Sequence, residues 1–580
     1  MIYMSFRWLK NLDKVVVVML GGILLTACSK QVTPQVSVAP VPSAKTDSVQ
    51  VVTIVPGKPV TLDTVAFGKL LADARGKCMQ FYLQHSFKTQ WLLDNQPSPL
   101  YIAFEEIVSH AGQYGLRASD YDLPAIQQGV KLLYEDKVNQ RSLVALDIHI
   151  TEMLFRFTTH LTVGKINEIT RGSGIWKQGP RNDRSLDVDL LNRVKTAEDL
   201  VTAIKLLQPA QEQYNKLQQA LAYYRSLENT TPPAIDIIKG LKVKQDDSHS
   251  IIPSVRKKLS LTDLKPYPMM YDSVTCAFDS LRYDAELVSA VKWFQARHGL
   301  EPDGIIGEKT LRFLNQSFRE KADIIALNME RLRWSRDKYG DNYIFVNIPD
   351  YTLRVYENRE PALEMRVIVG AVGKPTPVFS DVLENIVFSP TWTVPTSIIR
   401  EEIIPRLRNN ASYYADKNYV FYKDEVPIDP ATEVWDDSSN PYQYRVVQQP
   451  GPDNSLGLVK FLLTNDMSVY LHDTPNHRLF SKDYRAISHG CVRLDEPARF
   501  AAYLLRDQKG WDEDRIQKAM RANQPAGIRL KKKYEVHIEY FTAWVDDNGL
   551  INFREDIYGH DKRQLQQLYP KEQTSDLAGL

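Results

Sequence analysis

The sequence Ser-His-Gly-Cys-Val-Arg occupies residues 488–493, and the stretch VYLHDTP precedes it at residues 469–475. His472 and Ser488 have 15 residues between them. A cysteine nucleophile such as Cys491 needs a nearby base, because the thiolate is the reactive form and the leaving amine must regain a proton. Gly490 lets backbone N–H groups approach an oxyanion, and Arg493 adds positive potential that can hold a carboxylate. These residue types together favour acyl transfer by a cysteine.

Two other interpretations of these residues stay open at this point. Cys491 can be a buried structural thiol, since cysteine is often buried. Alternatively, a mixed His/Cys set can bind zinc, and its members would be His472, His477, His489 and Cys491.

Length and composition describe a large globular chain. With 580 residues the sequence is long enough for roughly four domains of about 150 residues each. A hydrophobic content of 43% and a charged content of 25% exclude a mainly disordered or collagen-like chain. Lys and Arg number 72 against 71 Asp and Glu, for a net charge of +1. Such a balance argues against a nucleic-acid-binding protein, so we expect no nucleic-acid partner.

Cysteine is rare, which excludes a disulfide scaffold and a Cys-rich zinc protein. The four cysteines are Cys28, Cys78, Cys276 and Cys491. Cys78 and Cys276 could pair in an oxidising compartment, although they fall in different predicted domains.

The N-terminus has the pattern of a secretory signal peptide over residues 1–27. Basic residues at 7, 10 and 14 precede an apolar run of 11 residues, Val15 to Leu25. A transmembrane helix needs about 20 residues, so we expect no permanent span. Residues 28–60 are rich in Val, Pro, Ser and Thr and predict a flexible tether.

The remaining chain divides into two helical regions and a strand-rich one. Apolar residues three and four apart predict an α-helical scaffold domain over 61–250. Residues 253–318 predict a small domain of short helices with a turn at Asp303-Gly304, and His298 there is expected to be structural. Residues 340–560 alternate as strands do, interrupted at 396–445 by a more helical, Tyr-rich insertion. The fold class is therefore multidomain α+β.

Several of these stretches resemble known bacterial sequences. Leu-Thr-Ala-Cys at 25–28 resembles a lipobox, which implies a diacylglycerol on Cys28. The sequence AVKWFQARHGLEPDGIIGEKTL, beginning at Ala290, resembles the small three-helix peptidoglycan-binding domain. A His followed after about 15 residues by Ser-His-Gly-Cys resembles the active-site motif of L,D-transpeptidases. The order of these regions is similar to that of the large lipid-anchored subgroup with a helical scaffold.

The resemblance implies a mixed β-sandwich catalytic domain, with 396–445 as a capping flap. It implies Cys491 as nucleophile and His472 as general base, whose ring a backbone carbonyl would orient. The remaining predicted site residues, for substrate or oxyanion contacts, are Ser488, His489, Gly490, Arg493 and Asp473. Backbone N–H groups of Gly490 and Cys491 are the expected oxyanion donors.

The implied reaction joins peptidoglycan stems. Cys491 would attack a donor tetrapeptide between the diamino acid at position 3 and D-Ala at position 4, and an acceptor amine would resolve the thioester to a 3→3 cross-link. The resemblance implies inhibition by carbapenems, no metal and no cofactor. It also implies a periplasmic protein on a lipid anchor, in the outer membrane of a Gram-negative bacterium. A hydrolytic peptidase and a non-catalytic wall-binding scaffold remain as alternatives, and the sequence does not reveal which acceptor is preferred.

Overall fold

The computed structural model describes residues 57–62, 76–135, 139–166, 176, 188–262, 280–335 and 339–570. The predicted signal peptide, Cys28, most of the predicted tether and Cys276 lie outside the described residues. The lipid anchor and a bridge between Cys78 and Cys276 therefore stay predictions. Within the described ranges, no helix combines the length and the apolar character needed to cross a bilayer.

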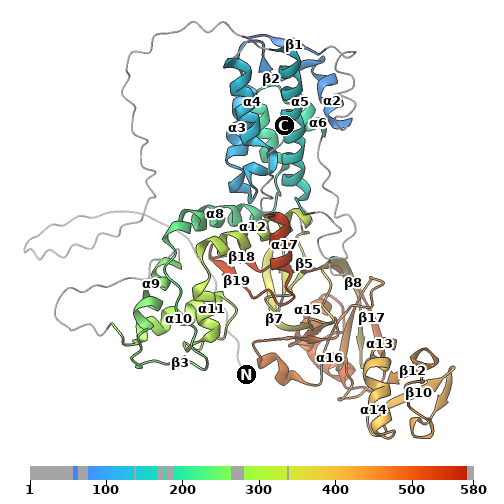
Figure 1. Cartoon of the computed structure of the whole chain (residues 1–580). Helices are drawn as coiled ribbons and strands as arrows, with labels where there is room; N and C mark the ends of the chain where they lie inside the picture. The colour runs from blue at the N-terminus through green and yellow to red at the C-terminus, as the bar shows by residue number, and fades with distance from the viewer. Residues whose placement is uncertain are drawn as a thin grey trace, which may run out of the picture. The chain divides into compact units, whose positions relative to one another are not determined.

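The N-terminal region is helical, as expected (Figure 1). Its helices are α2 Gly76–Gln84, α3 Pro99–Ser109, α4 Leu123–Glu135, α5 Gln140–Val163, α6 Val188–Asn192 and α7 Ala197–Leu207. Two short strands that the sequence did not indicate, β1 Pro59–Thr61 and β2 Lys88–Leu93, form an antiparallel pair. Asp147 of α5 holds β2 in place, because its buried carboxylate accepts hydrogen bonds from the backbone N–H groups of Trp91 and Leu92. Burial raises the pKa of Asp147 to about 6.

Two longer helices connect this region to the rest of the chain. Helix α8, Glu212–Ser226, packs its buried side chains against α12, Phe318–Trp334, in one hydrophobic cluster. Apolar side chains of α8 at three- and four-residue spacing, such as Tyr214, Leu217 and Leu221, form the contact face. Ser317 caps α12 in a reciprocal capping box with Glu320.

Between α8 and α12 lie three helices, α9 Ile252–Thr262, α10 Ala285–Arg297 and α11 Glu308–Asn315, and a short antiparallel pair, β3 Lys242–Val243 with β4 Ile306–Gly307. His298 is 4% exposed and stacks on Phe294 and Phe553. Its burial among aromatic rings agrees with the structural role that we expected. Arg297 donates two hydrogen bonds to the Ile551 carbonyl and so ties this small helical region to the strand-rich one.

The strand-rich region is built on one nine-stranded mixed sheet, whose pairing order is β15-β7-β16-β14-β13-β8-β17-β5-β6. Its strands are β5 Tyr343–Asn347, β6 Thr352–Glu357, β7 Glu360–Gly370, β8 Phe379–Phe388, β13 Val459–Leu463, β14 Leu471–His472, β15 Ala486–Ser488, β16 Val492–Leu494 and β17 Ala526–Glu539. Strand β7 also pairs with β6, the strand at the other end of the pairing order. The sheet therefore curves around a single hydrophobic core. Helices α15 Pro497–Leu505 and α16 Glu513–Met520 contribute to that core.

In the C-terminal part, residues 526–539 form the long strand β17. A small hairpin, β18 Ala543–Val545 with β19 Ile551–Phe553, follows it. A final helix, α17 His560–Leu568, packs against α12. The multidomain α+β class is confirmed, whereas the exact domain limits stay predictions.

The insertion is only partly helical, in contrast to the expectation. Residues 396–409 form α13 Thr396–Ile398, a π-helical turn Ile399–Ile403 and α14 Ile404–Asn409. The rest is an antiparallel sheet of β11 Val426–Ile428, β10 Tyr419–Lys423, β12 Tyr444–Gln448 and β9 Trp392–Thr393, in that order. Strand-favouring Tyr, Val and Phe residues make up most of β10.

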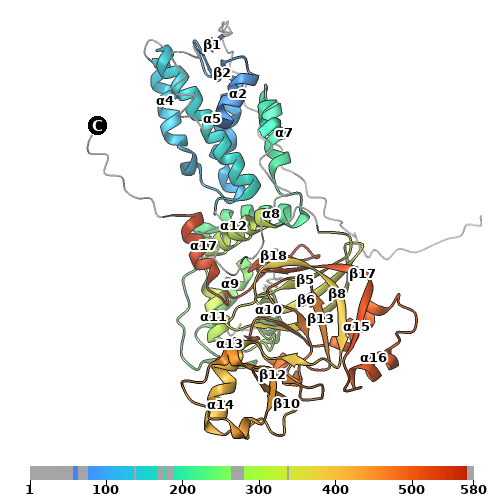
Figure 2. The same ribbon diagram turned by 90° about the vertical axis from the view of Figure 1, so that its right-hand side faces the viewer.

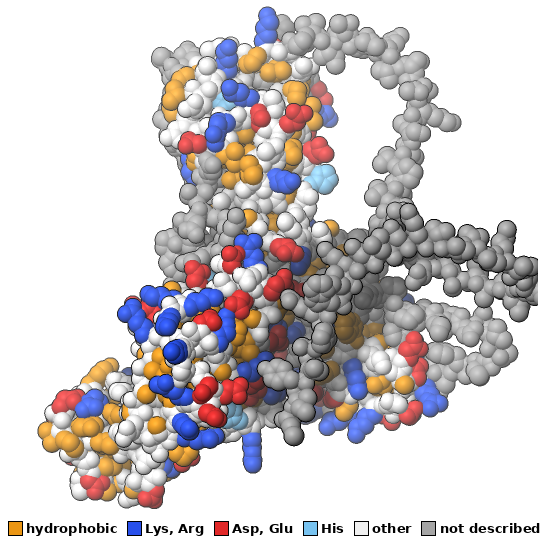
Figure 3. All heavy atoms as spheres, turned by 180° about the vertical axis from the view of Figure 1, so that it is seen from behind, with side chains coloured by type: hydrophobic (Ala, Val, Ile, Leu, Met, Phe, Trp, Pro, Cys, Tyr) orange, Lys and Arg blue, Asp and Glu red, His pale blue; other side chains and the backbone are white. Residues whose placement is uncertain are grey.

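The insertion has a hydrophobic core of its own, which includes Ile403, Phe421 and Trp435. Figure 2 shows α13, α14, β10 and β12 grouped beside the main sheet. The insertion exposes apolar side chains such as Val434 and Tyr442. Acidic and basic side chains are interspersed over the face of the molecule seen in Figure 3. The core of the insertion is thus separate from the core of the main sheet.

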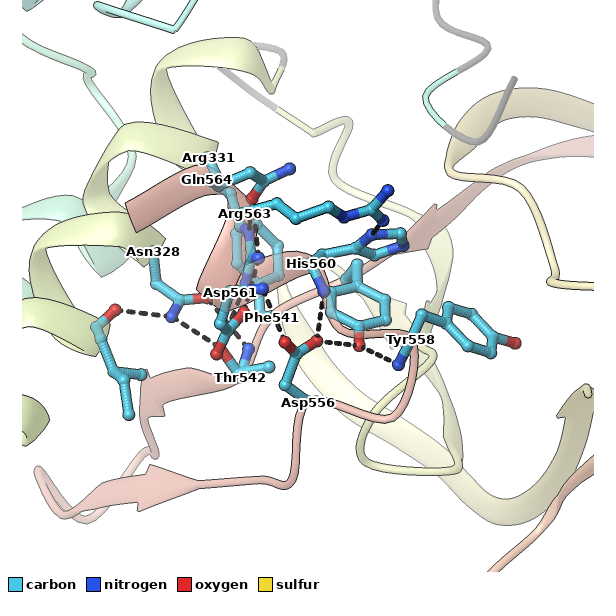
Figure 4. Close-up of polar contacts among 12 residues, drawn as sticks. Asn328, Arg331, Phe541, Thr542, Asp556, Tyr558, His560, Asp561, Arg563 and Gln564 are labelled. Atoms are coloured by element: carbon cyan, nitrogen blue, oxygen red, sulfur yellow. Dashed lines mark hydrogen bonds and ion pairs between the residues drawn. The ribbon is translucent and has the colours of Figure 1, made fainter. Parts of the chain in front are cut away.

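A buried polar cluster joins α12, α17 and the segment that leads into β18 (Figure 4). The Arg331 guanidinium contacts Asp561 Oδ1 at 2.6 Å, Gln564 Oε1 at 2.8 Å and Thr542 Oγ1 at 3.1 Å. Burial raises the pKa of Asp561, and the Arg331 charge opposes that shift. The carboxylate thus depends on Arg331 for its charge compensation.

Replacing Arg331 by Met should destabilise the protein strongly. The variant leaves Asp561 buried without its cation, a loss that typically costs about 3–5 kcal/mol. The measurement is urea unfolding followed by circular dichroism. The matched control is Arg359→Met, which removes an ion pair to Asp341 whose side chains are 72% and 62% exposed; exposed pairs contribute little. Equal changes in the two variants would contradict the role assigned to the Arg331 cluster.

Candidate active site

Cys491 lies in a tight turn between β15 and β16. Gly490 has φ +114°, a conformation that residues with a Cβ rarely adopt, so glycine is required at this position. Three hydrogen bonds hold the turn: Ser488 Oγ donates to the Cys491 carbonyl at 2.6 Å, Gly490 N–H donates to Ser488 Oγ at 3.1 Å, and Thr376 Oγ1 donates to the Gly490 carbonyl at 2.8 Å. The turn is therefore fixed from both sides.

His472 is the last residue of β14, which pairs in parallel with β16. Its Nδ1 lies 2.6 Å from the carbonyl oxygen of Asp473. A carbonyl only accepts hydrogen bonds, so Nδ1 carries the proton and Nε2 is left as the basic nitrogen. A backbone carbonyl was expected to orient this ring, and the structure identifies the one that does.

The His472 imidazole and the Cys491 thiol are both electrically neutral at neutral pH. Burial, and after it the charge of Arg493, lowers the pKa of His472 to about 3. Burial raises the pKa of the Cys491 thiol, and the Tyr470 backbone and the Arg493 charge oppose this shift. The thiol contacts the Ser468 carbonyl at 3.6 Å, and no hydrogen bond joins it to the ring of His472, although both residues are described. Catalytic hydrogen bonds often tighten only when substrate is bound.

Cys491 and His472 open onto one cavity of about 1120 Å³. Besides these two, it is lined by Ser488, His489, Gly490 and Arg493, so six of the predicted site residues share it. The insertion forms another part of the lining, with residues such as Ile398, Glu402 and Arg406. His489 Nε2 lies 2.5 Å from Glu402 Oε1, and Lys374 pairs with Glu401. The cavity thus lies between the Cys491 turn and the insertion.

Asp473 is the predicted site residue that does not line this cavity. Its buried carboxylate accepts hydrogen bonds from Leu458 N–H at 2.8 Å and Thr474 N–H at 2.7 Å, and pairs with His477 Nε2 at 3.0 Å. It braces the chain around His472 instead of facing a substrate.

Gly490 N–H also differs from the expectation of an oxyanion donor, since Ser488 Oγ accepts its hydrogen bond. Across the described ranges, no group of three or more His, Cys, Asp and Glu side chains is placed to hold a metal. His472, His477, His489 and Cys491 are accordingly not gathered as a zinc site.

Three residues of the site were not predicted from the sequence. Thr376 holds the Cys491 turn, and Glu402 contacts His489. Lys460 lines the cavity. Only Lys460 has a visible sequence signal. It is a lone cation between Val459 and Phe461 in a buried strand.

The neutral charge state of the Cys491 thiol and the His472 imidazole determines how the reaction of Cys491 with iodoacetamide should depend on pH. Because the thiol pKa is raised and His472 is not protonated at neutral pH, the alkylation rate should still be rising above pH 8.5, the usual range of a free thiol. Mass spectrometry of the peptide that carries Cys491 measures the rate, and Cys491→Ser provides the unlabelled control. A rate that levels off below pH 7 would instead indicate a preformed thiolate–imidazolium pair.

Three regions of the chain are similar to separate protein families. Residues 341–516 match the family model described as "L,D-transpeptidase catalytic domain". Residues 77–221 match "Scaffold domain", and residues 271–314 match "Putative peptidoglycan binding domain". A curated protein from Haemophilus influenzae, "Putative L,D-transpeptidase", is 36% identical over 240 residues, which are 41% of this chain and 48% of that protein. The chain thus matches about half the length of this relative.

Solved structures are more distant. The L,D-transpeptidase from Mycobacterium smegmatis is 14% identical, with a TM-score of 0.18, over 34% of this chain and 58% of that chain. The L,D-transpeptidase from Stackebrandtia nassauensis is 16% identical, with a TM-score of 0.20, over 53% of this chain and 97% of that chain. Residues 341–516, which contain all the residues that line the cavity of Cys491 and His472, are thus similar to an L,D-transpeptidase catalytic domain. The chain also has regions similar to a scaffold domain and to a peptidoglycan-binding domain.

Proposed function

We propose that this protein is a peptidoglycan L,D-transpeptidase that forms 3→3 cross-links through a thioester on Cys491. One observation carries the proposal: Cys491 and His472 share a cavity, and the Asp473 carbonyl holds His472 with Nε2 unprotonated. A neutral imidazole beside a neutral thiol is suited to take the thiol proton at the moment of attack.

The first step transfers the donor acyl group to Cys491. The sulfur attacks the carbonyl carbon between the diamino acid at stem position 3 and D-Ala at position 4, while His472 Nε2 takes the thiol proton. The backbone N–H of Cys491 is the oxyanion donor, since no partner is recorded for it within the described part of the chain. When the C–N bond breaks, the D-Ala amine leaves with the proton that His472 held.

The second step releases the enzyme. A side-chain amine of an acceptor stem attacks the thioester carbonyl, His472 accepts its proton, and the Cys491 thiolate leaves and is reprotonated. Water in place of the amine would make the protein a peptidase. We favour transfer because the cavity is lined on one side by the insertion, which limits the access of water.

The other regions support the same proposal. A peptidoglycan-binding domain at 271–314 suits an enzyme whose substrate is the wall, and the wall lies outside the cytoplasm. We therefore propose that the protein works in the periplasm. The lipobox-like sequence at 25–28 supports the further proposal that a lipid on Cys28 holds it to the outer membrane of a Gram-negative bacterium. Carbapenems are expected to acylate Cys491, because a strained lactam carbonyl offers the same electrophile as the donor.

Substitution at Cys491 and His472 tests the chemistry. Cys491→Ser should abolish cross-linking, because a serine hydroxyl is hardly ionised and is a poorer nucleophile. His472→Ala should lower the rate by about 10²-fold or more. The measurement is mass spectrometry of muropeptides formed from purified disaccharide-tetrapeptides, with circular dichroism as the folding check.

His110→Ala is the matched control, because this side chain is exposed and lies outside the cavity lining. It should retain most of the activity. Cross-linking by Cys491→Ser at the wild-type rate would refute the nucleophile. A product that is only the shortened tripeptide would favour the peptidase.

We further propose that residues 396–445 cap the donor site and position the acceptor. The insertion supplies cavity-lining residues and a core of its own, and its two ends lie side by side, because β9 pairs with β12 through Thr393 and Val447. Insertions of this length in compact domains are usually functional.

Replacing residues 396–445 by a short Gly-Ser turn should reduce cross-linking more than acylation of Cys491 by a carbapenem. The small lactam needs only the thiol and the oxyanion donor, whereas the acceptor needs the cap. Intact-mass measurement of the carbapenem adduct and a muropeptide assay compare the two reactions in one preparation. Equal losses in a folded variant would reject the cap as an acceptor-positioning element.

A further inference from the structure

Three adjacent strands place Lys460, His472 and Arg493 in one row. Lys460 of β13 is the register partner of His472 of β14, and His472 is the register partner of Arg493 of β16. Register partners on neighbouring strands project their side chains to the same face, with Cα atoms about 5 Å apart. The proposed base is thus flanked by a cation on each side.

The burial of the neighbouring residues shows which face this is. Val459 and Phe461 on β13, Leu471 on β14, and Val492 and Leu494 on β16 are all buried in the core of the sheet. Since side chains alternate along a strand, the row points away from that core. All three of its members line the cavity that contains Cys491.

Among the residues that the structure describes, the two cations of the row have no carboxylate partner. Four Lys and Arg side chains line the cavity; Lys374 pairs with Glu401, and Arg406 pairs with Glu402. For the other two, Lys460 and Arg493, no ion pair is recorded with any residue that the structure describes, and Arg493 Nε is buried without a hydrogen-bond partner.

Partial burial without a counter-ion is unfavourable for both side chains. Burial lowers the pKa of Lys460 and also that of Arg493. Desolvated cations are stabilised by an anion that completes their hydrogen bonds. Because the two lie on either side of His472, an anion between them would be held next to the reacting atoms.

We propose that Lys460 is a substrate-binding residue that, together with Arg493, binds a carboxylate of the donor peptide. This inference rests on the proposed function, since peptidoglycan stems are the carboxylate-bearing ligands of that reaction. Two carboxylates lie close to the bond that is cleaved: the one on the D-Ala that leaves and the one on the diamino acid. We call the place between Lys460 and Arg493 the carboxylate subsite. Both carboxylates would bind there through the same charged hydrogen bonds, and the experiment below distinguishes them.

The experiment compares three donor tetrapeptides with the wild-type protein and Lys460→Met. One donor has free carboxylates, one is amidated at the terminal D-Ala, and one is amidated at the diamino acid. For the wild type, KM should rise about 10- to 100-fold for one of the two amides, as expected for the loss of a hydrogen bond to a charged group. That amide identifies the carboxylate bound.

In Lys460→Met, the free donor should bind as poorly as that amide does in the wild type, and the discrimination between them should largely disappear. Lys460→Arg should restore much of it, because it keeps the charge. The matched control is Lys531→Met, an exposed lysine of β17 that does not line the cavity. It should discriminate like the wild type.

Two results would overturn the proposal. In the first, the wild type shows no preference between the free donor and either amide. In the second, Lys460→Met changes KM equally for all donors, or shifts only the pH–rate profile. The second result would mean that Lys460 acts through the fold or through the ionisation of His472.

Binding of the donors to the inactive variant Cys491→Ala tests the carboxylate subsite independently of the reaction. Calorimetry with this variant should give a weaker Kd for the amide that the wild type disfavours, and the double variant with Lys460→Met should not distinguish acid from amide. If the wild type turns over none of the donors while Cys491→Ala still prefers the acid, the proposed function fails and the subsite stands. Turnover without such preference leaves the function standing and rejects the subsite.

Discussion

The parallel pairing of β14 with β16 is the constraint on which the site depends. Both strands are short, and their register sets His472 beside Arg493 and so beside the turn that carries Cys491. A slip by one residue would turn His472 into the core and bring Leu471 to the cavity. The buried residues Leu471, Val492 and Leu494 oppose such a slip, because each would then lose its place in the core. Hydrophobic burial on one face of the sheet thus fixes the chemistry on the other.

The turn itself depends on contacts from distant parts of the chain. Thr376 accepts a hydrogen bond from Gly370 N–H and donates one to the Gly490 carbonyl, while its own N–H donates to the Tyr558 hydroxyl. Tyr558 in turn donates to the Gly370 carbonyl at 2.6 Å. The C-terminal segment therefore supports the nucleophile through Thr376, and this explains how residues far from Cys491 in sequence contribute to its geometry.

Much of the fold class was predictable from sequence, because periodicity reports which faces are buried. The helical regions and strands such as 343–347 follow directly from it. The secondary structure of the insertion was harder to predict. The residues from Tyr419 onward form a strand, but the aromatic-rich stretch also resembled a helix face. The pairing of β17 with both β8 and β5 was not predictable from sequence, because it depends on contacts distant in sequence.

The candidate site was predictable where a motif is contiguous. Cys491 and His472 stand out by residue type and spacing, whereas the positions of Asp473 and Gly490 in the site required hydrogen bonds that a sequence does not display. Lys460 needed the register across three strands.

Trapping of the acyl-enzyme tests the central claim most directly. Intact-mass spectrometry of the wild-type protein at short times after mixing with a donor tetrapeptide should show an adduct equal to the donor minus its terminal D-Ala. Peptide mapping should place it on the peptide that contains Cys491. Cross-linked product without such an adduct at short times, or an adduct on another residue, would contradict the account.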